Sequence, residues 1–497
     1  MNYNLAKEDK ISKVAVAFMV LLISSAFFLG IAILDGPIWC VDSLSYTSMD
    51  FFREPLYPTF LWILRTIFGE AIYRNDLPIY LFVAVIIQSV LWVYVTLMTT
   101  LYVFDLADGF FYRDGVYVRR VDKRKSRIHL IVFTTLLFQF LTPILNRFVV
   151  KRGSMYSECI MTESLAMPLF VLFCVRLSRW LVHKYKRDFV SLVLIAFIIV
   201  NIRKQMTVVL VLWIGASFIC NVLMKKTRSI KRFFIVILTI IIISFASKLL
   251  DCTYNYFARG VFHEHTGNGM GALCVMMYSA DREDADLFTD NEKFPGEKEL
   301  FLKIYDECEE QGLLLDSVRG ADWSDLTIHF AESYDVIGYD IVVPATFEYI
   351  REQNPDIEYN QLRIMDSEIE SHMAKVLMGQ DKKDILTVYG ANLIRGFAYS
   401  NAKASPFILV IISFVLYGIY VLLFVIFGVM AAGEELMNDT EIFVFGGVSL
   451  LGLIINTGVV ALLIFPQGRY MAYATGLFYT TLILLLGGIV WKRRKAT

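Results

Sequence analysis

The residues best suited to chemistry lie in the segment DGPIWCVDSLSYTSMDFFREPLYP, residues 35–58, directly after the first apolar run. It contains the carboxylates Asp42 and Asp50 and the charged pair Arg53-Glu54. A charged loop between hydrophobic segments must lie in water or line a polar cavity, because hydrocarbon cannot satisfy its backbone groups. A carboxylate at the edge of such a cavity can accept a proton from a hydroxyl group. We therefore predict that this loop carries the chemistry of a membrane enzyme, with Asp42 as the base.

Two features of this loop depend on its local structure. Asp42 and Tyr46 are four residues apart and would share one face of a helix. Asp42 could equally cap a helix that begins at Ser43, and taken alone this residue pattern favours the capping role. Asp50 is expected to pair with Arg53.

Basic residues near the predicted outer surface form a second group. Arg203 and Lys204 follow a run at 189–202 that is too short to cross a membrane fully, and Arg469 precedes the last run. Basic groups at that depth are costly unless they face water or an anion. Their expected ligand is an anion such as the phosphate of a lipid carrier, whereas contact with lipid head groups is the alternative explanation. We favour that alternative for Arg65 and Arg74.

The elements that must position these residues are membrane helices. Of the 497 residues, 57% are hydrophobic and only 19% are charged, and charge-free windows of about 20 residues recur. This composition predicts an all-α polytopic membrane protein with about ten transmembrane helices. The predicted spans are 14–34, 78–104, 129–146, 164–181, 189–202, 206–224, 233–250, 404–428, 441–465 and 470–491.

Loop charges predict the orientation. Lys and Arg gather in short segments such as 105–128, 225–232 and 492–495, which places them and both termini in the cytoplasm. The run at 56–72 is short and contains Arg65, so we interpret it as an interfacial helix on the outer surface. The spans lack charge in their middles, which favours an enzyme at the outer interface over a transporter.

Three regions follow from this reading. Residues 1–250 form an N-terminal transmembrane catalytic module whose first outer loop is 35–77, and residues 404–497 form the C-terminal membrane helices. Residues 251–403 are polar, with helical patterning, and are predicted to form a mainly α extracytoplasmic domain inserted before the last three spans. Apolar residues spaced three and four apart predict one of its amphipathic helices: Leu362, Met365, Ile369, Met373 and Val376.

The sequence predicts no cofactor, and a divalent metal has no support in it. The seven cysteines are scattered without a CxxC pair. His263-Glu264-His265 has no evident third ligand and is expected in a surface loop. The glycine-rich run 267–271 is expected to be a flexible loop, with the option that it moves over the cavity. The net charge of −1 says nothing about nucleic acid, but no basic domain stands apart, so nucleic acid is not expected as a partner.

Four motifs together resemble the C-superfamily glycosyltransferases, which are polytopic enzymes that use polyprenyl-phosphate or dolichyl-phosphate sugars. This family includes protein mannosyltransferases and aminoarabinose transferases. The resemblance covers roughly residues 10–250 and, more weakly, 404–491. The motifs are Asp42-x-x-x-Tyr46 followed by Arg53-x-Pro55-Leu56-Tyr57-Pro58, Thr162-Glu163-Ser164-Leu165-Ala166-Met167-Pro168-Leu169, Asn201-Ile202-Arg203-Lys204-Gln205, and Gln467-Gly468-Arg469-Tyr470.

The resemblance implies inverting sugar transfer from a polyprenyl-phosphate donor to a glycan, lipid or protein acceptor at the outer face of the membrane. Asp42 would be the catalytic base, without a metal. Many family members carry a second acidic residue beside this aspartate, whereas this chain has Ser43. The donor phosphate would be bound by Arg53, Arg203, Lys204, Arg469 and Tyr470, while Glu163 and Tyr46 would orient the acceptor.

Several alternatives stay open. Glu163 could instead pair only with Arg147 or Lys151. The protein could be a polymerase or ligase of lipid-linked glycans, a lipid flippase or transporter, or a membrane anchor that presents the 251–403 domain. Asn-x-Ser/Thr occurs only at Asn438, on the predicted cytoplasmic side, which favours a bacterial plasma membrane over the endoplasmic reticulum.

Overall fold

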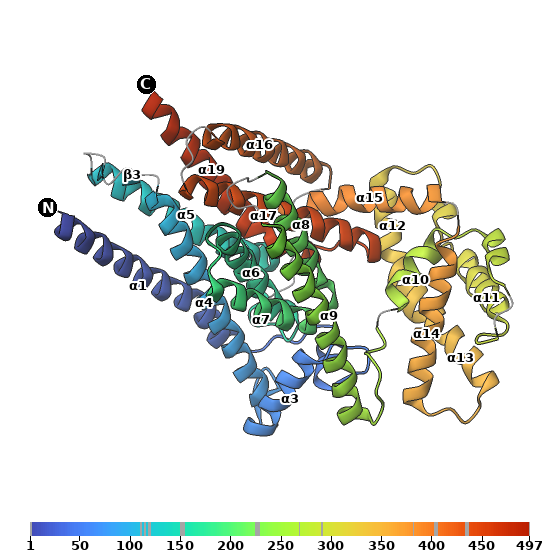
Figure 1. The fold of residues 1–497 in the computed structure, drawn as a ribbon. Helices are drawn as coiled ribbons and strands as arrows, with labels where there is room; N and C mark the ends of the chain where they lie inside the picture. The colour runs from blue at the N-terminus through green and yellow to red at the C-terminus, as the bar shows by residue number, and fades with distance from the viewer. Residues whose placement is uncertain are drawn as a thin grey trace.

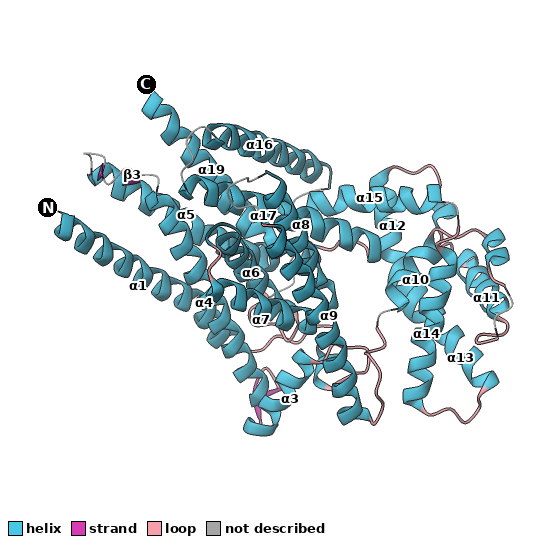
Figure 2. Ribbon diagram, in the orientation of Figure 1, coloured by secondary structure: helices cyan, strands magenta, loops and turns pink. Residues whose placement is uncertain are grey.

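The computed structural model describes residues 2–109, 112–113, 116–117, 121–149, 155–223, 229–267, 269–289, 292–380, 382–401, 406–432 and 437–496. Almost all of this chain is helical, and its strands form two short hairpins (Figure 2). The hairpins are β1 (Ile72–Arg74) with β2 (Leu77–Pro78), and β3 (Tyr112–Arg113) with β4 (Val116–Tyr117).

Long apolar helices make up the main bundle. They are α1 (Asn2–Asp35), α4 (Ile79–Gly109), α5 (Val121–Ile144) continued by η1 (Leu145–Val149), α6 (Glu163–His183), α7 (Lys186–Ile202), α8 (Val208–Leu223) preceded by η2 (Lys204–Thr207), α9 (Ile230–Arg259), α16 (Pro406–Ala432), α17 (Met437–Leu463), and α19 (Thr475–Ala496) preceded by α18 (Gly468–Met471) and η7 (Ala472–Ala474).

Within the described residues, nine helical segments are long and apolar enough to cross a membrane. The chain is therefore a multi-pass membrane protein, as its composition predicts. The tenth predicted span, 189–202, corresponds to α7, which has 17 residues and is not among the nine. At 1.5 Å per residue it extends about 25 Å, which is short of a full crossing of the hydrocarbon.

The two ends of the chain lie at one end of the bundle, and a separate group of helices lies at the opposite end (Figure 1). We call that group the outer domain. Its elements are α10 (Gly269–Tyr278), η4 (Arg282–Leu287), α11 (Glu297–Glu310), η5 (Leu315–Val318), α12 (Trp323–Asp335), η6 (Val336–Val342), α13 (Val343–Gln353), α14 (Tyr359–Leu377) and α15 (Lys382–Asn401).

The outer domain has its own hydrophobic core, distinct from the core of the bundle. The predicted stripe of α14 faces that core, because Leu362, Ile369 and Met373 are buried and Met365 and Val376 pack against it. The predicted boundary at 250–251 falls inside α9, which continues to Arg259. The predicted boundary at 403–404 lies outside the described residues.

Helices α6 and α7 form an antiparallel pair that is central to the bundle. Lys184, in the left-handed region at φ 59°, ends α6, and α7 starts at Lys186. Near this turn, buried Arg176 donates to buried Asp188 at 2.9 Å. The pair fixes the start of one helix against the other.

Breaking this pair should destabilise the protein strongly. In Asp188→Ala the Arg176 guanidinium is left buried without its carboxylate, which costs about 3–5 kcal/mol. Thermal unfolding in detergent measures the loss. Glu70→Ala is the matched control, since it breaks the exposed Arg65–Glu70 pair, worth at most about 1 kcal/mol. Equal melting temperatures for the two variants would contradict the structural role of Asp188.

A pair of buried carboxyl groups makes the stability of the outer domain depend on pH. Asp366 and Glu370 are one turn apart on α14, and both are buried. Burial and the neighbouring Asp366 raise the pKa of Glu370 well above its usual value, and burial raises the pKa of Asp366 to about 6. A raised pKa in the folded state stabilises the fold fully below the unfolded pKa, about 4.3 for Glu, and this contribution is lost as the pH rises through the folded pKa.

We therefore expect wild-type protein to unfold at a lower temperature at about pH 8 than at about pH 5. Glu370→Gln, which imitates the protonated group, should flatten this dependence and stabilise the protein at about pH 8. Glu368→Gln changes an exposed residue paired with Lys293 and should keep the wild-type slope. Identical slopes for all three proteins would show that Glu370 does not titrate in this range.

The glycine-rich run is packed, contrary to the flexible loop expected from the sequence. A Cβ at Gly267 would lie 2.7 Å from the carbonyl oxygen of Phe52, and a Cβ at Gly269 would lie 2.8 Å from Glu370. Gly269 also begins α10. Gly267 allows the chain before the outer domain to approach the first loop closely, and Gly269 allows α10 to approach α14, so their small size accounts for both contacts.

Candidate functional site

The first outer loop is tied to the segment before α6. Ile38 forms a parallel bridge with Cys159, and the Ser43 hydroxyl accepts from Cys40 N at 2.8 Å and donates to Ile160 O at 2.9 Å. A short helix, α2 (Ser43–Thr47), follows. Next comes α3 (Leu56–Phe68), which corresponds to the predicted interfacial helix 56–72 and leaves Trp62 half exposed.

Asp42 directly precedes α2, but its side chain makes no capping hydrogen bond. Instead, its Oδ1 accepts from Arg53 at 2.8 Å and its Oδ2 accepts from Arg469 at 2.8 Å. The capping role favoured by the residue pattern is therefore not the one seen. The Arg53 side chain pairs with Asp42 and the Asp50 carboxylate accepts from Phe52 N at 2.8 Å, so their side chains do not pair. The expected partnership of Asp50 and Arg53 is present only in the backbone, where Arg53 N donates to Asp50 O at 3.1 Å.

A second carboxylate lies behind this pair. Glu163 begins α6 and pairs with Arg203, which ends α7, at 2.8 Å, and its Oε1 lies 3.9 Å from Nε of Arg469. The Tyr470 ring lies between the two guanidinium groups, with its centroid 4.9 Å from Arg203 and 4.8 Å from Arg469. The alternative pairing of Glu163 with Arg147 is excluded, because Arg147 pairs with Asp35; Lys151 lies outside the described residues.

Tyr46 joins the two halves of this cluster. Its buried hydroxyl lies 3.3 Å from both the Arg53 guanidinium and the Thr162 hydroxyl, and Thr162 also accepts from Arg203 at 3.0 Å. Seven of the eight sequence-predicted site residues thus lie in one cluster, which we call the arginine cluster: Asp42, Tyr46, Arg53, Glu163, Arg203, Arg469 and Tyr470.

Three guanidinium groups and two carboxylates make up the charged part of the arginine cluster. The carboxyl groups of Glu54 and Asp335 lie within electrostatic reach of it. Burial raises the pKa of Asp42, but Arg469 and Arg53 outweigh it and hold that pKa below its usual value. Asp42 is therefore ionised at neutral pH. Nε of Arg469 is buried and has no hydrogen-bond acceptor in the described part of the chain.

Lys204 departs from its predicted place. Arg203 has an extended backbone, with φ −155° and ψ 121°, so adjacent side chains diverge. Arg203 points into the arginine cluster, whereas the Lys204 ammonium group lies 3.8 Å from Glu264, outside it. The Lys204 backbone N–H donates to the Glu54 carboxylate, which holds this segment next to the first loop.

Lys204 instead lines a neighbouring pocket of about 250 Å³. Its walls come from the first loop, α7, α8, α9 and the linker to the outer domain, and they include Glu54, Asn201, Lys204, Lys248, Glu264 and His265. Lys248 pairs with Glu264 at 2.7 Å. We call this the lysine pocket.

His265 also lines the lysine pocket, and the surface position expected for it is wrong. It is buried, and its Nδ1 lies 2.5 Å from the Asp251 carboxylate on α9. Burial lowers the pKa of His265, but the bond to Asp251 and the charge of Glu54 raise it above its usual value overall. The two residues are 14 positions apart, so no local sequence pattern predicts this contact.

Two residues of the outer domain face the arginine cluster and were not predicted. Asp335 ends α12, and its pKa is raised by burial and Asp42 while Arg469 opposes the rise. Tyr339 lies in the π-helical turn η6, where burial raises its pKa to about 12 within the fields of Arg53 and Asp42. The only signal for them is the acidic, aromatic end of α12, since a π-helical turn is not readable from sequence.

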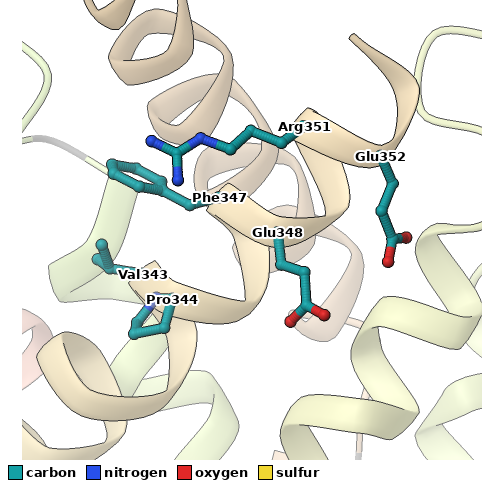
Figure 3. Close-up of a pocket in the computed structure, with 6 residues that line it drawn as sticks. All are labelled: Val343, Pro344, Phe347, Glu348, Arg351 and Glu352. Atoms are coloured by element: carbon teal, nitrogen blue, oxygen red, sulfur yellow. The ribbon is translucent and has the colours of Figure 1, made fainter. Parts of the chain in front are cut away.

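A larger hollow of about 590 Å³ lies along α13 (Figure 3). It is lined by Val343, Pro344, Phe347, Glu348, Arg351 and Glu352, all on one helix. The Arg351 side chain lies toward the Phe347 ring, 5.9 Å from its centroid, while Glu348 and Glu352 extend on the other side of the helix (Figure 3). Its charged groups do not converge, so this hollow is a weaker candidate than the arginine cluster.

In the ranges that the structure describes, no group of three or more His, Cys, Asp or Glu side chains is arranged to hold a metal ion. No protein-family model, no curated protein and no solved structure matches the chain. The site must therefore be interpreted from its own geometry.

Proposed function

We propose that this protein is an integral-membrane glycosyltransferase that acts at the outer face of the membrane and uses a polyprenyl-phosphate sugar as donor. In this proposal α7 is the tenth membrane helix and ends below the outer surface, both termini are cytoplasmic, and the outer domain is extracytoplasmic in a bacterial plasma membrane. The acceptor is a glycan, lipid or protein hydroxyl, and no metal takes part. The observation that carries the proposal is one ionised carboxylate, Asp42, held between two arginines, with a third arginine close behind them.

In this proposal the donor phosphate is the anion that binds to the guanidinium groups of the arginine cluster. Arginine forks suit phosphate oxygens, and each charge-assisted bond contributes about 1.5–3 kcal/mol. Nε of Arg469, buried without an acceptor among the described residues, is available for such a bond. The lysine pocket, which α7 and α9 help to line, lies on the other side of Arg203-Lys204, and in this proposal the donor reaches the cluster through it.

Phosphate binding also frees the base. With no anion bound, both Asp42 oxygens are held by guanidinium groups, so Asp42 is a weak base. A phosphate that competes for Arg53 and Arg469 removes much of that stabilisation, and the pKa of Asp42 rises toward its usual value. The base is then most active when the donor is present, which limits loss of donor to water.

The transfer step follows from these positions. The acceptor hydroxyl oxygen attacks the anomeric carbon, the bond from that carbon to the phosphate oxygen breaks, and the hydroxyl proton passes to Asp42. The leaving polyprenyl phosphate keeps the bonding electron pair, and the arginine cluster stabilises this charge. A single displacement inverts the anomeric configuration.

Two alternatives are separable from this proposal. A polymerase or ligase of lipid-linked glycans would use a diphosphate carrier. A flippase or transporter would move lipid without breaking a bond, and it usually places ionisable groups within its spans. The charged pairs Arg176–Asp188 and His183–Glu441 lie near helix ends, at the turn between α6 and α7 and at the start of α17.

Mass spectrometry of lipid that copurifies with the protein tests the proposal. We expect polyprenyl monophosphate or its sugar ester with wild-type protein. Arg53→Gln should lower its occupancy roughly tenfold or more, because one charge-assisted contact to the phosphate is lost. Arg74→Gln is the control, since Arg74 donates to carbonyl groups at the end of α1. A diphosphate carrier would support the polymerase or ligase, and absence of any polyprenyl lipid would reject all carrier-dependent functions.

A further inference from the structure

The first loop enters the core of the outer domain. The Phe52 side chain packs against that core, although it lies more than 200 residues before the domain begins. The backbone N–H of Thr266 donates to Phe51 O at 3.0 Å, and Gly267 lies against the carbonyl of Phe52. The Arg53 guanidinium stands over the Phe52 ring, 5.5 Å from its centroid. Arg53 also donates to Ser45 at 2.7 Å and to Tyr46 at 3.3 Å within its own loop, so the outer domain is one of two supports for its position.

The link between the last two long helices enters the same core. Phe465 is buried there, with its ring 5.3 Å from that of Tyr334 on α12, and the Tyr334 hydroxyl donates to Leu463 O at 3.4 Å. Four residues later, Arg469 lies in α18, whose first turn is closed by the bond from Tyr470 N to Gln467 O at 3.0 Å. The position of Arg469 therefore depends on the outer domain as well.

We propose that the outer domain is a positioning device: its core holds Phe52 and Phe465, and through them it holds Arg53 and Arg469 against the two oxygens of Asp42. The proposal rests on the proposed function for its catalytic meaning, but the positioning itself does not. Phe52 and Phe465 are positioning residues, since neither contacts Asp42. A movement of the outer domain on binding the acceptor would shift both guanidinium groups together and change the basicity of Asp42.

The groups that face Asp42 come from three directions. Cys40 and Arg53 belong to its own loop, Arg469 to the link after α17, and Asp335 and Tyr339 to the outer domain. The charges of Arg203 and Glu163 lie behind Arg469. Only the two arginines donate hydrogen bonds to the Asp42 carboxylate among these described residues. Loss of either one should raise the pKa of Asp42 by about one unit or more.

Carbodiimide coupling of Asp42 to glycine ethyl ester, quantified by peptide mass spectrometry, measures its protonation without any substrate. Full-length protein in detergent is labelled between about pH 3 and 6. Phe465→Ala and Phe52→Ala should each raise the coupling rate at about pH 5 roughly tenfold, since one pKa unit changes the protonated fraction tenfold. The midpoint of the rate against pH should shift upward, which a change in accessibility alone does not cause. Phe465→Leu should restore most of the wild-type profile.

Phe288→Ala is the matched control. Phe288 is buried in the same core, 5.0 Å from the Phe301 ring, but it adjoins neither arginine. It should destabilise the outer domain while leaving the Asp42 profile unchanged. An equal shift in Phe288→Ala would mean that general loosening, not positioning, moves Asp42. Unchanged profiles in both Phe465→Ala and Phe52→Ala would overturn the proposal, whatever the outcome of the lipid analysis. A shifted profile without detectable sugar transfer would retain the positioning device and reject the proposed function.

Discussion

Asp42→Asn is expected to abolish sugar transfer while the protein still folds and inserts. The amide keeps the shape of the carboxylate and one acceptor oxygen, but it cannot take up the acceptor proton. Loss of a general base typically lowers the rate by about 10²–10⁴-fold. The measurement is the initial rate of transfer from a radiolabelled polyprenyl-phosphate sugar in proteoliposomes, with thermal unfolding as the check on folding.

Asp50→Asn is the control for this experiment. Asp50 lies in the same loop, but among the described residues its carboxylate accepts only from the backbone N–H of Phe52, and an asparagine oxygen can accept the same bond. Its rate should stay within about threefold of wild type, because a turn contact of this kind has no part in proton transfer. Undiminished turnover in Asp42→Asn would remove Asp42 from the mechanism and leave the arginine cluster with a binding role alone.

Arg469→Gln should produce the second large effect. It removes a guanidinium group that contacts Asp42 and Tyr470 and that we expect to stabilise the leaving phosphate. Loss of one such donor typically lowers kcat by about 10²–10³-fold. Arg469→Lys should fall between this variant and wild type, since lysine keeps the charge but lacks the planar fork.

Arg147→Gln is the control variant for Arg469→Gln. Arg147 is also a partly buried arginine paired with an aspartate, Asp35, but it lies outside the arginine cluster. Its kcat should be close to that of wild type. If Arg147→Gln and Arg469→Gln slow the reaction equally, the effect comes from general destabilisation and the electrostatic role of Arg469 is wrong.

Much of the site could be predicted because its residues are charged and stand beside apolar membrane segments. Placing an arginine at membrane depth costs free energy unless it faces water or an anion. Arg203 and Arg469 both stand beside apolar runs, so the sequence predicts that they share a polar site. The same argument failed for Lys204, because it assigns two adjacent residues, Arg203 and Lys204, to the same site. The extended backbone at Arg203 sends the two side chains to opposite sides, and that conformation depends on how α7 ends.

The partners of these residues could not be predicted, because they are distant in the chain. Asp42 and Arg469 are separated by 427 positions, and His265 meets Asp251 across a linker that folds back on α9. Phe52 looked like an ordinary loop aromatic, yet it packs against the core of a domain that begins far beyond it. Such contacts depend on the packing of whole helices, which no local pattern encodes.

Hydrophobic runs of membrane length and loops rich in charge are local properties, and hydrocarbon imposes the same requirement on each helix separately. The sequence by itself therefore determined that this chain is a helical multi-pass membrane protein with a polar domain between its hydrophobic regions. Only the tertiary structure decided that Asp42 lies between Arg53 and Arg469, and that Phe52 and Phe465, which are near them in the chain, pack with the core of the outer domain. Electrostatic attraction and side-chain packing act over a few ångströms in space, irrespective of separation along the chain.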